Sequence, residues 1–428
     1  MSATLERGIH AFLEQVDAPT ALFFSTCVRC GVCADACEFY VDTGDPKYTP
    51  INKLRPFERV WRQNYSFWGK LGKALGLTKP ITDQELAEWE LLIYDGCTMC
   101  GRCSMVCPVG NDITYMIRKA REGFAASGHT PEGQRGAVRR TVEKGSPMGV
   151  SLQTLQAQIA HIEKATGLTI PLDVVGADYM VMLSSMETVN FPEYLEALVR
   201  IFKQAGITWT INSDYFEATN AGHQLGSSDI AAELVERIVK GAEKLRVKYV
   251  ISPECGHAYY ALRWEGPNVI GRPFPFKVVH IMELLDQLRS EGRFKTEGVE
   301  QDRLTFHDPC QVVRRGGVVE EPRRLLNMVA PNFVEMREHG KMNWCCGGGG
   351  GVSANERAEP LRLKSFKTKK VQLEELKVDV LVTACANCRI MLEEGLEHYS
   401  MELPVVGLTE MLAAHLVEDG PESVSGED

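Results

Sequence analysis

Cys27-Val-Arg-Cys30-Gly-Val-Cys33-Ala-Asp-Ala-Cys37 and Cys97-Thr-Met-Cys100-Gly-Arg-Cys103-Ser-Met-Val-Cys107-Pro108 are the two stretches that decide how the N-terminal part of this 428-residue chain folds. Both have the spacing C-x2-C-x2-C-x3-C. With this spacing three thiolates of one loop bind one [4Fe-4S] cluster, while the fourth cysteine binds the other cluster of a pair. We therefore expect one cubane cluster on Cys27, Cys30, Cys33 and Cys107, and a second on Cys97, Cys100, Cys103 and Cys37.

Zinc is the alternative metal for a single four-cysteine run, but zinc sites usually consist of two well-separated C-x2-C pairs. Two runs with identical spacing favour iron and sulfide. Between and after the runs, helices are expected from Asp83, with Thr82 as its cap, and from about Asp112 to Arg121. Residues 1–150 are therefore predicted to form a helical, ferredoxin-type domain with two clusters in its loops.

Six of the 14 cysteines remain, and five of these form one constellation: Cys310, Cys345, Cys346, Cys385 and Cys388. Apolar runs of strand length precede Cys310 and Cys385, and a helical pattern covers 357–376. This order predicts a parallel sheet with ligands at the carboxyl ends of its strands. Five glycines, of which Gly347 and Gly348 come first, do not match a phosphate loop, and their N–H groups are expected to face an anionic cluster.

An eroded internal repeat precedes this constellation. The stretch 245–255 resembles 376–385, and 177–185 resembles the strand before Cys310. We therefore expect a fold of the α + α/β class, in which two α/β units, at 170–265 and 300–418, follow the helical domain. In the first unit Ser184 or Ser185 takes the place of Cys310, and only Cys255 is kept, which could match either Cys385 or Cys388. The acidic residues 419–428 are expected to form a disordered tail.

These motifs resemble the cysteine-rich CCG proteins related to the D subunit of membrane-bound heterodisulfide reductase. The resemblance rests on thirteen cysteines and covers nearly the whole chain. It implies a further [4Fe-4S] cluster, of non-cubane type, on the five-cysteine constellation. One complete unit plus the single cysteine in Glu254-Cys255-Gly256-His257 is more similar to the DsrK and TmcB types of membrane-associated respiratory complexes in sulfur metabolism. The incomplete first unit is not expected to hold a second non-cubane cluster.

Cys255 and His257 are the catalytic candidates. Cys255 is expected beside the five cysteines, either as an extra ligand or as a thiol that pairs with substrate sulfur. His257 would supply a positive charge or a proton. The alternatives are an inert buried cysteine and a histidine with a structural hydrogen bond. His307 is expected to orient its loop, and the pair Arg314-Arg315 to lie on a solvated face or to face an acidic group.

Composition limits the class of protein. The chain is 44% hydrophobic and 24% charged, as in globular proteins, and its net charge of -10 without a long basic run disfavours nucleic acid as a partner. It has no apolar run of membrane length and no secretory leader, so a cytoplasmic location is expected. Trp61, Tyr65 and Trp68 are expected either in the core or in a docking patch beside the clusters.

The sequence and the resemblance together predict an iron-sulfur electron-transfer subunit of a membrane-associated respiratory oxidoreductase. The resemblance implies three partners: a membrane cytochrome b-type quinone-interacting subunit, a multihaem cytochrome c reached through it, and a small thiol or disulfide protein or cofactor. The chain would bind peripherally to the inner face of the cytoplasmic membrane. One alternative is the iron-sulfur subunit of a flavin-dependent 2-hydroxy-acid or glycerol-3-phosphate dehydrogenase. The other alternative is a non-catalytic zinc-binding scaffold.

Overall fold

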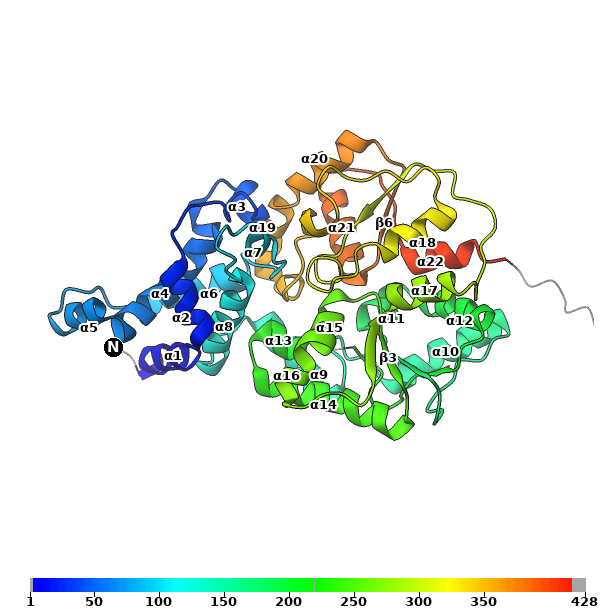
Figure 1. Ribbon diagram of the computed structural model, residues 1–428, viewed down its shortest axis with the longest axis horizontal. Coiled ribbons are helices and arrows are strands. Elements are labelled where there is room, and N and C mark those ends of the chain that lie inside the picture. The colour runs from blue at the N-terminus through cyan, green and yellow to red at the C-terminus, as the bar shows by residue number, and fades with distance from the viewer. Residues whose placement is uncertain (1–2, 219, 418–428) are drawn as a thin grey trace, which may run out of the picture.

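The computed structural model describes residues 3–218 and 220–417, in which a helical part is followed by two α/β units (Figure 1). This arrangement agrees with the expected α + α/β class, and each α/β unit contains one small parallel sheet. The acidic tail expected at 419–428 lies outside the described residues. In the described part of the chain, no helix combines the length and the apolarity needed to cross a lipid bilayer.

The helical part packs around a cluster of aromatic rings. Its helices are α1 (Ala3–Glu14), α2 (Ala18–Thr26), α3 (Glu38–Val41), α4 (Pro50–Tyr65), α5 (Phe67–Ala74), α6 (Asp83–Tyr94), α7 (Arg102–Met105) and α8 (Ile113–Ala126). The ring of Trp89 lies 4.5 Å from that of Phe12 and 4.8 Å from that of Phe124. Thr82 caps α6, as predicted, and Asp112, the expected start of the next helix, is the N-cap of α8. The two four-cysteine runs lie in the connections around α3 and α7.

The core of the helical part ends at Phe124, well before the expected domain boundary at 150. The next two helices, α9 (Glu132–Lys144) and α10 (Leu152–Thr166), belong to the α/β part. Helix α9 contacts α13 (Ala221–Leu225), and α10 buries Leu155 and Ile159 in the core of the sheets. Helix α10 packs through an apolar face, whereas α9 buries Gln134, Gly136, Val138 and Thr141.

The first α/β unit has four parallel strands in the order β2-β1-β3-β4. The strands are β1 (Tyr179–Val181), β2 (Trp209–Thr210), β3 (Tyr249–Ser252) and β4 (Lys277–His280). The helices that follow α10 are α11 (Ser185–Asn190), α12 (Glu193–Ala205), α13, α14 (Ser228–Leu245), α15 (Gly256–Tyr260), α16 (Gly266–Ile270) and α17 (Ile281–Ser290). Because β4 pairs with β3 along its whole length, this unit extends past the expected boundary at 265.

The second α/β unit has three parallel strands in the order β5-β6-β7. They are β5 (Leu304–His307), β6 (Val380–Thr383) and β7 (Val405–Gly407). Its helices are α18 (Glu321–Val329), α19 (Glu359–Lys364), α20 (Lys367–Leu376), α21 (Ala386–His398) and α22 (Leu408–Ala414). The helical pattern expected over 357–376 forms two helices, α19 and α20.

The two units repeat the same topology. A parallel bridge from Leu304 to Phe333 occupies, beside β5, the position that β2 has beside β1. The central strands β3 and β6 therefore correspond, and each leads into a helix whose N-cap residue is a cysteine, Cys255 on α15 and Cys385 on α21. Cys255 thus corresponds to Cys385 and not to Cys388. By the same comparison Ser184 follows β1 at the distance at which Cys310 follows β5.

The two units share one hydrophobic core, in which α12 packs on α22 and α17 packs on α18. Glu254 joins them at the centre. Its carboxylate accepts hydrogen bonds from the Thr409 N–H and hydroxyl, and its carbonyl accepts one from the Ala386 N–H at 2.9 Å. The loops that follow the strands of both units are thereby held next to one another and next to the helical part.

Candidate metal centres

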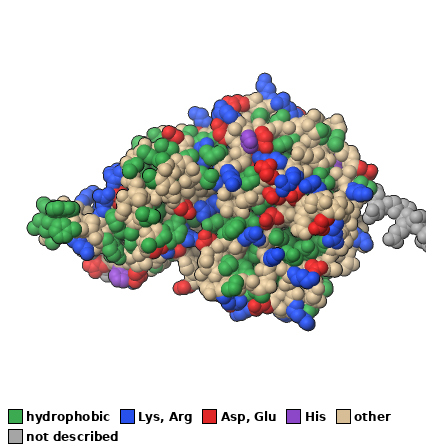
Figure 2. Space-filling view, in the orientation of Figure 1, with side chains coloured by type: hydrophobic (Ala, Val, Ile, Leu, Met, Phe, Trp, Pro, Cys, Tyr) green, Lys and Arg blue, Asp and Glu red, His purple; other side chains and the backbone are tan. Residues whose placement is uncertain are grey.

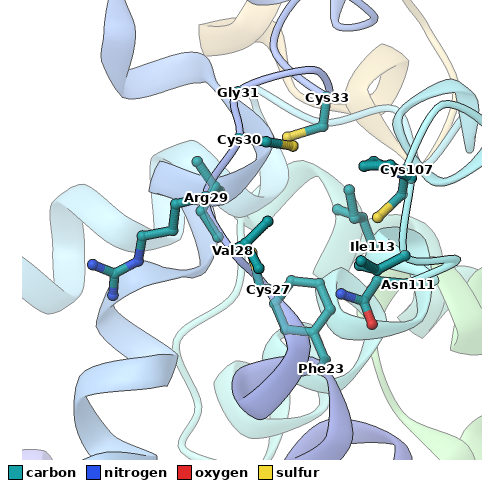
Figure 3. Close-up of a pocket in the computed structure, with 13 residues that line it drawn as sticks. Phe23, Cys27, Val28, Arg29, Cys30, Gly31, Cys33, Cys107, Asn111 and Ile113 are labelled. Atoms are coloured by element: carbon teal, nitrogen blue, oxygen red, sulfur yellow. The ribbon is translucent and has the colours of Figure 1, made fainter.

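The first set of four cysteines surrounds a cavity in the helical part (Figure 3). It consists of Cys27, Cys30 and Cys33 from the first run and Cys107 from the second. Cys30 is exposed, and the other three thiols are half-buried. Apolar side chains, including Phe23 and Ile113, line the rest of the cavity. The structure therefore brings together the first predicted group of four, and it leaves this group close to solvent.

The second set surrounds a neighbouring cavity and consists of Cys97, Cys100, Cys103 and Cys37. Here too one cysteine comes from the other run. The buried Lys53 ammonium lies 3.4 Å from the Cys37 Sγ. Burial alone would lower the pKa of Lys53, but the charges of Cys37 and its neighbouring thiolates raise it above its usual value. A cation is thus held against ligands that must be anionic to bind iron.

The five-cysteine set is buried between the second α/β unit and the helical part. Cys310 follows β5, the pair Cys345-Cys346 precedes the glycine run, and Cys385 and Cys388 lie at the start of α21. All five side chains are 4 to 5% exposed, and Cys100 of the second set packs against them. Five converging soft sulfur ligands in an apolar shell suit an iron-sulfur cluster better than a hard cation.

His307 belongs to this set, although the sequence suggested only that it orients a loop. The ligand-forming atoms of His307, Cys346 and Cys388 lie within 4.8 Å of one another. The ring is 1% exposed, and within the described part of the chain neither ring nitrogen has a hydrogen-bond partner. Burial lowers the pKa of His307, so a neutral ring faces the thiols. Orphaned buried nitrogens beside five thiols fit a site that holds a further group.

Two other charged side chains near this set were not singled out from the sequence. Glu38 replaces the proline that ends the second run, and burial together with the charges of Cys100 and Cys346 raises its pKa well above the usual value. Burial lowers the pKa of Lys369 to about 8, and its ammonium donates to the Gln372 Oε1 at 2.8 Å. Lys369 lies in a strongly charged segment, so nothing in the sequence set it apart from exposed lysines.

The glycine run, residues 347–351, is a point of close packing between three parts of the chain. A Cβ on Gly348 would lie 2.2 Å from the Met391 Cγ, and one on Gly350 would lie 2.9 Å from the Thr98 carbonyl oxygen. The Gly350 N–H donates to the His257 Nε2 at 3.0 Å. The glycines are therefore required by close approach, and at least one of the N–H groups expected to face a cluster has a histidine as its partner.

Replacing Gly348 by Ala is expected to destabilise the protein by about 1–3 kcal/mol, because the new methyl group overlaps the Met391 side chain beside the five cysteines. The melting temperature of the variant should fall, and iron should be released earlier on heating. Gly136→Ala is the matched control, since a Cβ there meets only the tip of Arg140 at 3.4 Å in helix α9. Equal melting temperatures for Gly348→Ala and wild type would contradict this packing.

Arginines fasten the helical part to the α/β units. Arg314 is buried and donates to the carbonyls of Cys100 and Lys341 and to the Asn343 Oδ1. Arg315 donates to the Tyr260 hydroxyl at 2.5 Å. The expected solvated basic pair is therefore wrong for Arg314, because the Cys100 carbonyl of the second cysteine run, the Lys341 carbonyl and the Asn343 side chain supply the acceptors that solvent would otherwise supply.

A cavity of about 270 Å³ lies at the carboxyl end of the first sheet, in the place that corresponds to the five-cysteine set. Its lining includes Ser184, Ser185, Glu217, Cys255, His257, Gly351 and Asn387. Asn387 lies between Cys385 and Cys388, so the cavity adjoins the five cysteines. The repeat has thus replaced sulfur ligands by oxygen-bearing side chains and open space, and it keeps one thiol.

The expected positive charge on His257 is not supported by its surroundings. Burial lowers the pKa of His257 to about 4, and its Nε2 accepts a hydrogen bond. Burial also raises the pKa of the Cys255 thiol. A neutral imidazole therefore lies near a protonated thiol, because neither group gains enough from its neighbours to offset the loss of hydration.

Glu217 is expected to make stability depend on pH, since burial raises its pKa to about 8 from 4.5, against hydrogen bonds from Ser185. The stabilising contribution of the neutral carboxyl is complete below about pH 4.5 and is lost as the pH rises through 8. The stability of wild type relative to Glu217→Gln should fall between these values, by up to about 5 kcal/mol. Melting temperatures of both proteins from pH 5 to about 9 test this. Parallel curves would show that Glu217 does not titrate in this range.

Comparison with known proteins gives two domain matches. The cysteine-rich CCG domain matches residues 304–393, and the 4Fe-4S dicluster domain matches residues 24–111. The first match covers the five-cysteine set, and the second covers both sets of four.

Several curated relatives match most of the chain. The Hdr-like menaquinol oxidoreductase iron-sulfur subunit of Archaeoglobus profundus is 27% identical over 96% of this chain and 82% of its own length. The D subunit of dihydromethanophenazine:CoB–CoM heterodisulfide reductase of Methanosarcina acetivorans is 28% identical over 94% of this chain and 96% of its own length. EtfAB:quinone oxidoreductase of Syntrophomonas wolfei is 25% identical over 88% of this chain and 56% of its own length. The chain thus combines a 4Fe-4S dicluster domain with a cysteine-rich CCG domain, and along most of its length it resembles the D subunit of heterodisulfide reductase and the Hdr-like iron-sulfur subunits, as its motifs predicted.

Proposed function

We propose that this protein is the iron-sulfur electron-transfer subunit of a membrane-associated oxidoreductase. Two cubane [4Fe-4S] clusters would bind to the two sets of four cysteines, and a non-cubane [4Fe-4S] cluster to the five-cysteine set. The observation that carries the proposal is the contact between the second and third sets. Cys100 packs against the five cysteines, and the Cys345 Sγ lies 3.4 Å from the Thr98 hydroxyl oxygen, within the second run.

The clusters supply single-electron transfer when bound, and the chain arranges their ligands in a series. The first set, with the exposed Cys30, is where a partner can approach. The second set is in contact with the third, and the third is closed off from solvent. We infer that a quinone-linked membrane subunit of cytochrome b type, with a multihaem cytochrome c beyond it, exchanges electrons at the exposed end. The names of the relatives, which include menaquinol and quinone oxidoreductases, support a quinone-linked complex.

The cavity beside the third set is the proposed thiol or disulfide site. Reduction of a disulfide consumes two electrons and two protons and releases two thiols. In the proposed cycle the Cys255 sulfur would bond to one substrate sulfur as the substrate S–S bond breaks, and the Cys255 proton would pass to the leaving sulfur. Two electrons and two protons would then cleave this mixed disulfide, release the second thiol and restore the Cys255 thiol, while Ser185 and Glu217 line the cavity and would supply polar contacts. His257 would position the glycine run through Gly350 instead of donating a proton from a charged ring. The volume of about 270 Å³ suits a small thiol compound or the tip of a peptide.

Metal analysis of the anaerobically purified chain tests the number of clusters. About twelve irons with matching sulfide are expected from three four-iron clusters. Zinc in place of four of the irons would favour the scaffold alternative.

Disulfide turnover tests the role of the cavity. Wild type and Cys255→Ser are compared, with a reduced viologen dye as the electron source and the iron content measured for each. The proposal expects both proteins to hold the same iron and only wild type to reduce an added disulfide. Equal turnover by both would exclude a role for Cys255. Absence of disulfide turnover in both, together with rapid exchange of electrons with a flavoprotein, would favour the iron-sulfur subunit of a flavin-dependent dehydrogenase.

A further inference from the structure

Helix α5 and the segment that follows it project from the helical part, at the end of the molecule away from the α/β units (Figure 1). Figure 2 shows hydrophobic side chains gathered at this end. The exposed ones are Tyr65 (52%), Phe67 (72%), Trp68 (77%), Leu71 (40%), Leu75 (62%) and Leu77 (78%). We call these six residues the apolar tip. Single exposed apolar residues are ordinary, but a contiguous group that contains aromatic rings and three leucines marks an interaction surface.

The apolar tip is a helical hairpin that is held by hydrogen bonds. Ser66 caps α5 by accepting a hydrogen bond from the Gly69 N–H at 3.0 Å. The Lys73 ammonium reaches back to the Asn64 Oδ1 at 3.0 Å, and the Gln63 side chain donates to the Lys79 carbonyl. Of the three aromatics considered in the sequence, Trp61 lies at the base, with its ring 5.3 Å from that of Phe24, whereas Tyr65 and Trp68 are exposed.

Basic residues lie in and beside the apolar tip. Residues 59–82 contain five basic and no acidic side chains, in a chain whose net charge is -10. The basic residues are Arg59, Arg62, Lys70, Lys73 and Lys79. Glu58 pairs with Arg62, and Glu85 pairs with both Arg59 and Lys79, so among the described residues of this segment Lys70 and Lys73 are the cations without a carboxylate partner. Lys70 and Lys73 are exposed on α5 itself.

Phe67, Leu71 and Leu75 recur at intervals of four and lie on one side of α5, with Trp68 beside them. The two lysines of α5 follow a different spacing. Aromatic and leucine side chains on one face with lysines at its border are the composition of segments that lie in the interface of a membrane.

We propose that the apolar tip inserts into the headgroup region of a lipid bilayer that contains anionic phospholipids, with Lys70 and Lys73 against the phosphates. Charge favours this occupant over a second copy of the chain, because a twofold dimer through the tip would bring the lysines of the two copies together. The inference goes beyond the proposed electron transfer and does not rest on it.

Insertion of the apolar tip would also bring the first cysteine set toward the bilayer. Arg29, within the first run, forms an ion pair of 2.8 Å with Glu58, which lies on the same helix as Tyr65. Helix α4 thus connects the exposed end of the cluster series with the apolar tip. A quinone-linked partner in the same membrane would then meet the first set without a long tether.

Sedimentation of the cluster-loaded full chain with vesicles tests the proposal. Phosphatidylcholine vesicles with and without phosphatidylglycerol are compared at low and high salt. Wild type is expected to bind the anionic vesicles and to be released by salt. The double variant Phe67→Ser, Trp68→Ser should partition at least ~10-fold more weakly, and Lys70→Gln, Lys73→Gln ~10- to 30-fold more weakly. Amide hydrogen exchange of residues 66–77 should slow when vesicles are added.

Matched controls replace an exposed tryptophan and an exposed lysine of the first α/β unit, as Trp264→Ser and Lys240→Gln, and should bind as wild type does. Unchanged iron content in every variant shows that the cluster sites are intact. Absence of binding to anionic vesicles, or binding that the tip variants do not weaken, would overturn the proposal. Self-association of wild type that the tip variants abolish, without vesicle binding, would overturn it in favour of a homodimer.

Discussion

Cys346→Ala is expected to lower the iron content from about twelve to about eight per chain, through loss of the cluster on the five-cysteine set. Cys346 lies at the centre of this set, where hydrogen bonds from Cys345 and Cys388 hold its pKa well below the usual value and His307 lies beside it. Its thiolate is thus the member of the set that the surroundings favour most. Without it, the remaining sulfurs are left around a gap in a buried site.

Iron and sulfide analysis of anaerobically prepared protein measures this loss, and electron paramagnetic resonance of the reduced protein checks that both cubane signals remain. Cys255→Ala is the matched control, since Cys255 has the equivalent position in the first unit, and it should keep about twelve irons. Loss of iron from Cys255→Ala would instead make Cys255 a ligand. Full iron content in Cys346→Ala would show that the five-cysteine set does not hold a cluster.

Arg121→Met is expected to destabilise the protein by about 3 kcal/mol and to lower the melting temperature by ~3 °C. Arg121 is fully buried, and its guanidinium donates to four backbone carbonyls, those of Ile93, Cys97, Gln224 and Gly350. These carbonyls belong to the helical part and to both α/β units. Methionine fills a similar volume but donates to none of them, so buried acceptors lose their partners.

Thermal unfolding followed by circular dichroism and by the loss of cluster absorbance measures the effect. Arg139→Met, at an exposed position of α9, should change stability by no more than about 0.5 kcal/mol. Because Arg121 fixes the carbonyl of Cys97, cluster absorbance in Arg121→Met should be lost before the helical signal. Unfolding of Arg121→Met that coincides with wild type would mean that the three parts of the chain are held together without this junction.

The groupings of the two four-cysteine sets could be predicted because short spacing fixes them. Three cysteines with two residues between each pair must line one loop, and the fourth must point away, wherever the loops lie in the fold. The same holds for helix starts at Thr82 and Asp112, where the capping side chain and the N–H that it accepts from are three residues apart. Features of this kind depend only on neighbours in sequence.

The repeat was visible in the sequence, but its alignment was not. Two unequal connections separate the strands, so a count of residues could not decide which cysteine matches Cys255. Pairing of β3 and β6 at the centres of their sheets decides it, because position in a sheet is set by hydrogen bonds between distant strands. Strand β4 also joins the first unit through hydrogen bonds to a distant strand, which is why the unit predicted from the sequence ended before it.

By itself, the sequence determined how the cysteines group, the class of fold and the order of its parts, since these follow from residue types that recur at fixed separations. Only the tertiary structure decided that His307 faces the thiols, that Arg314 and Arg121 are buried junctions, and that Cys255 and His257 are uncharged beside an open cavity. These properties depend on which groups from distant segments remove water from one another, and burial is a property of the assembled chain.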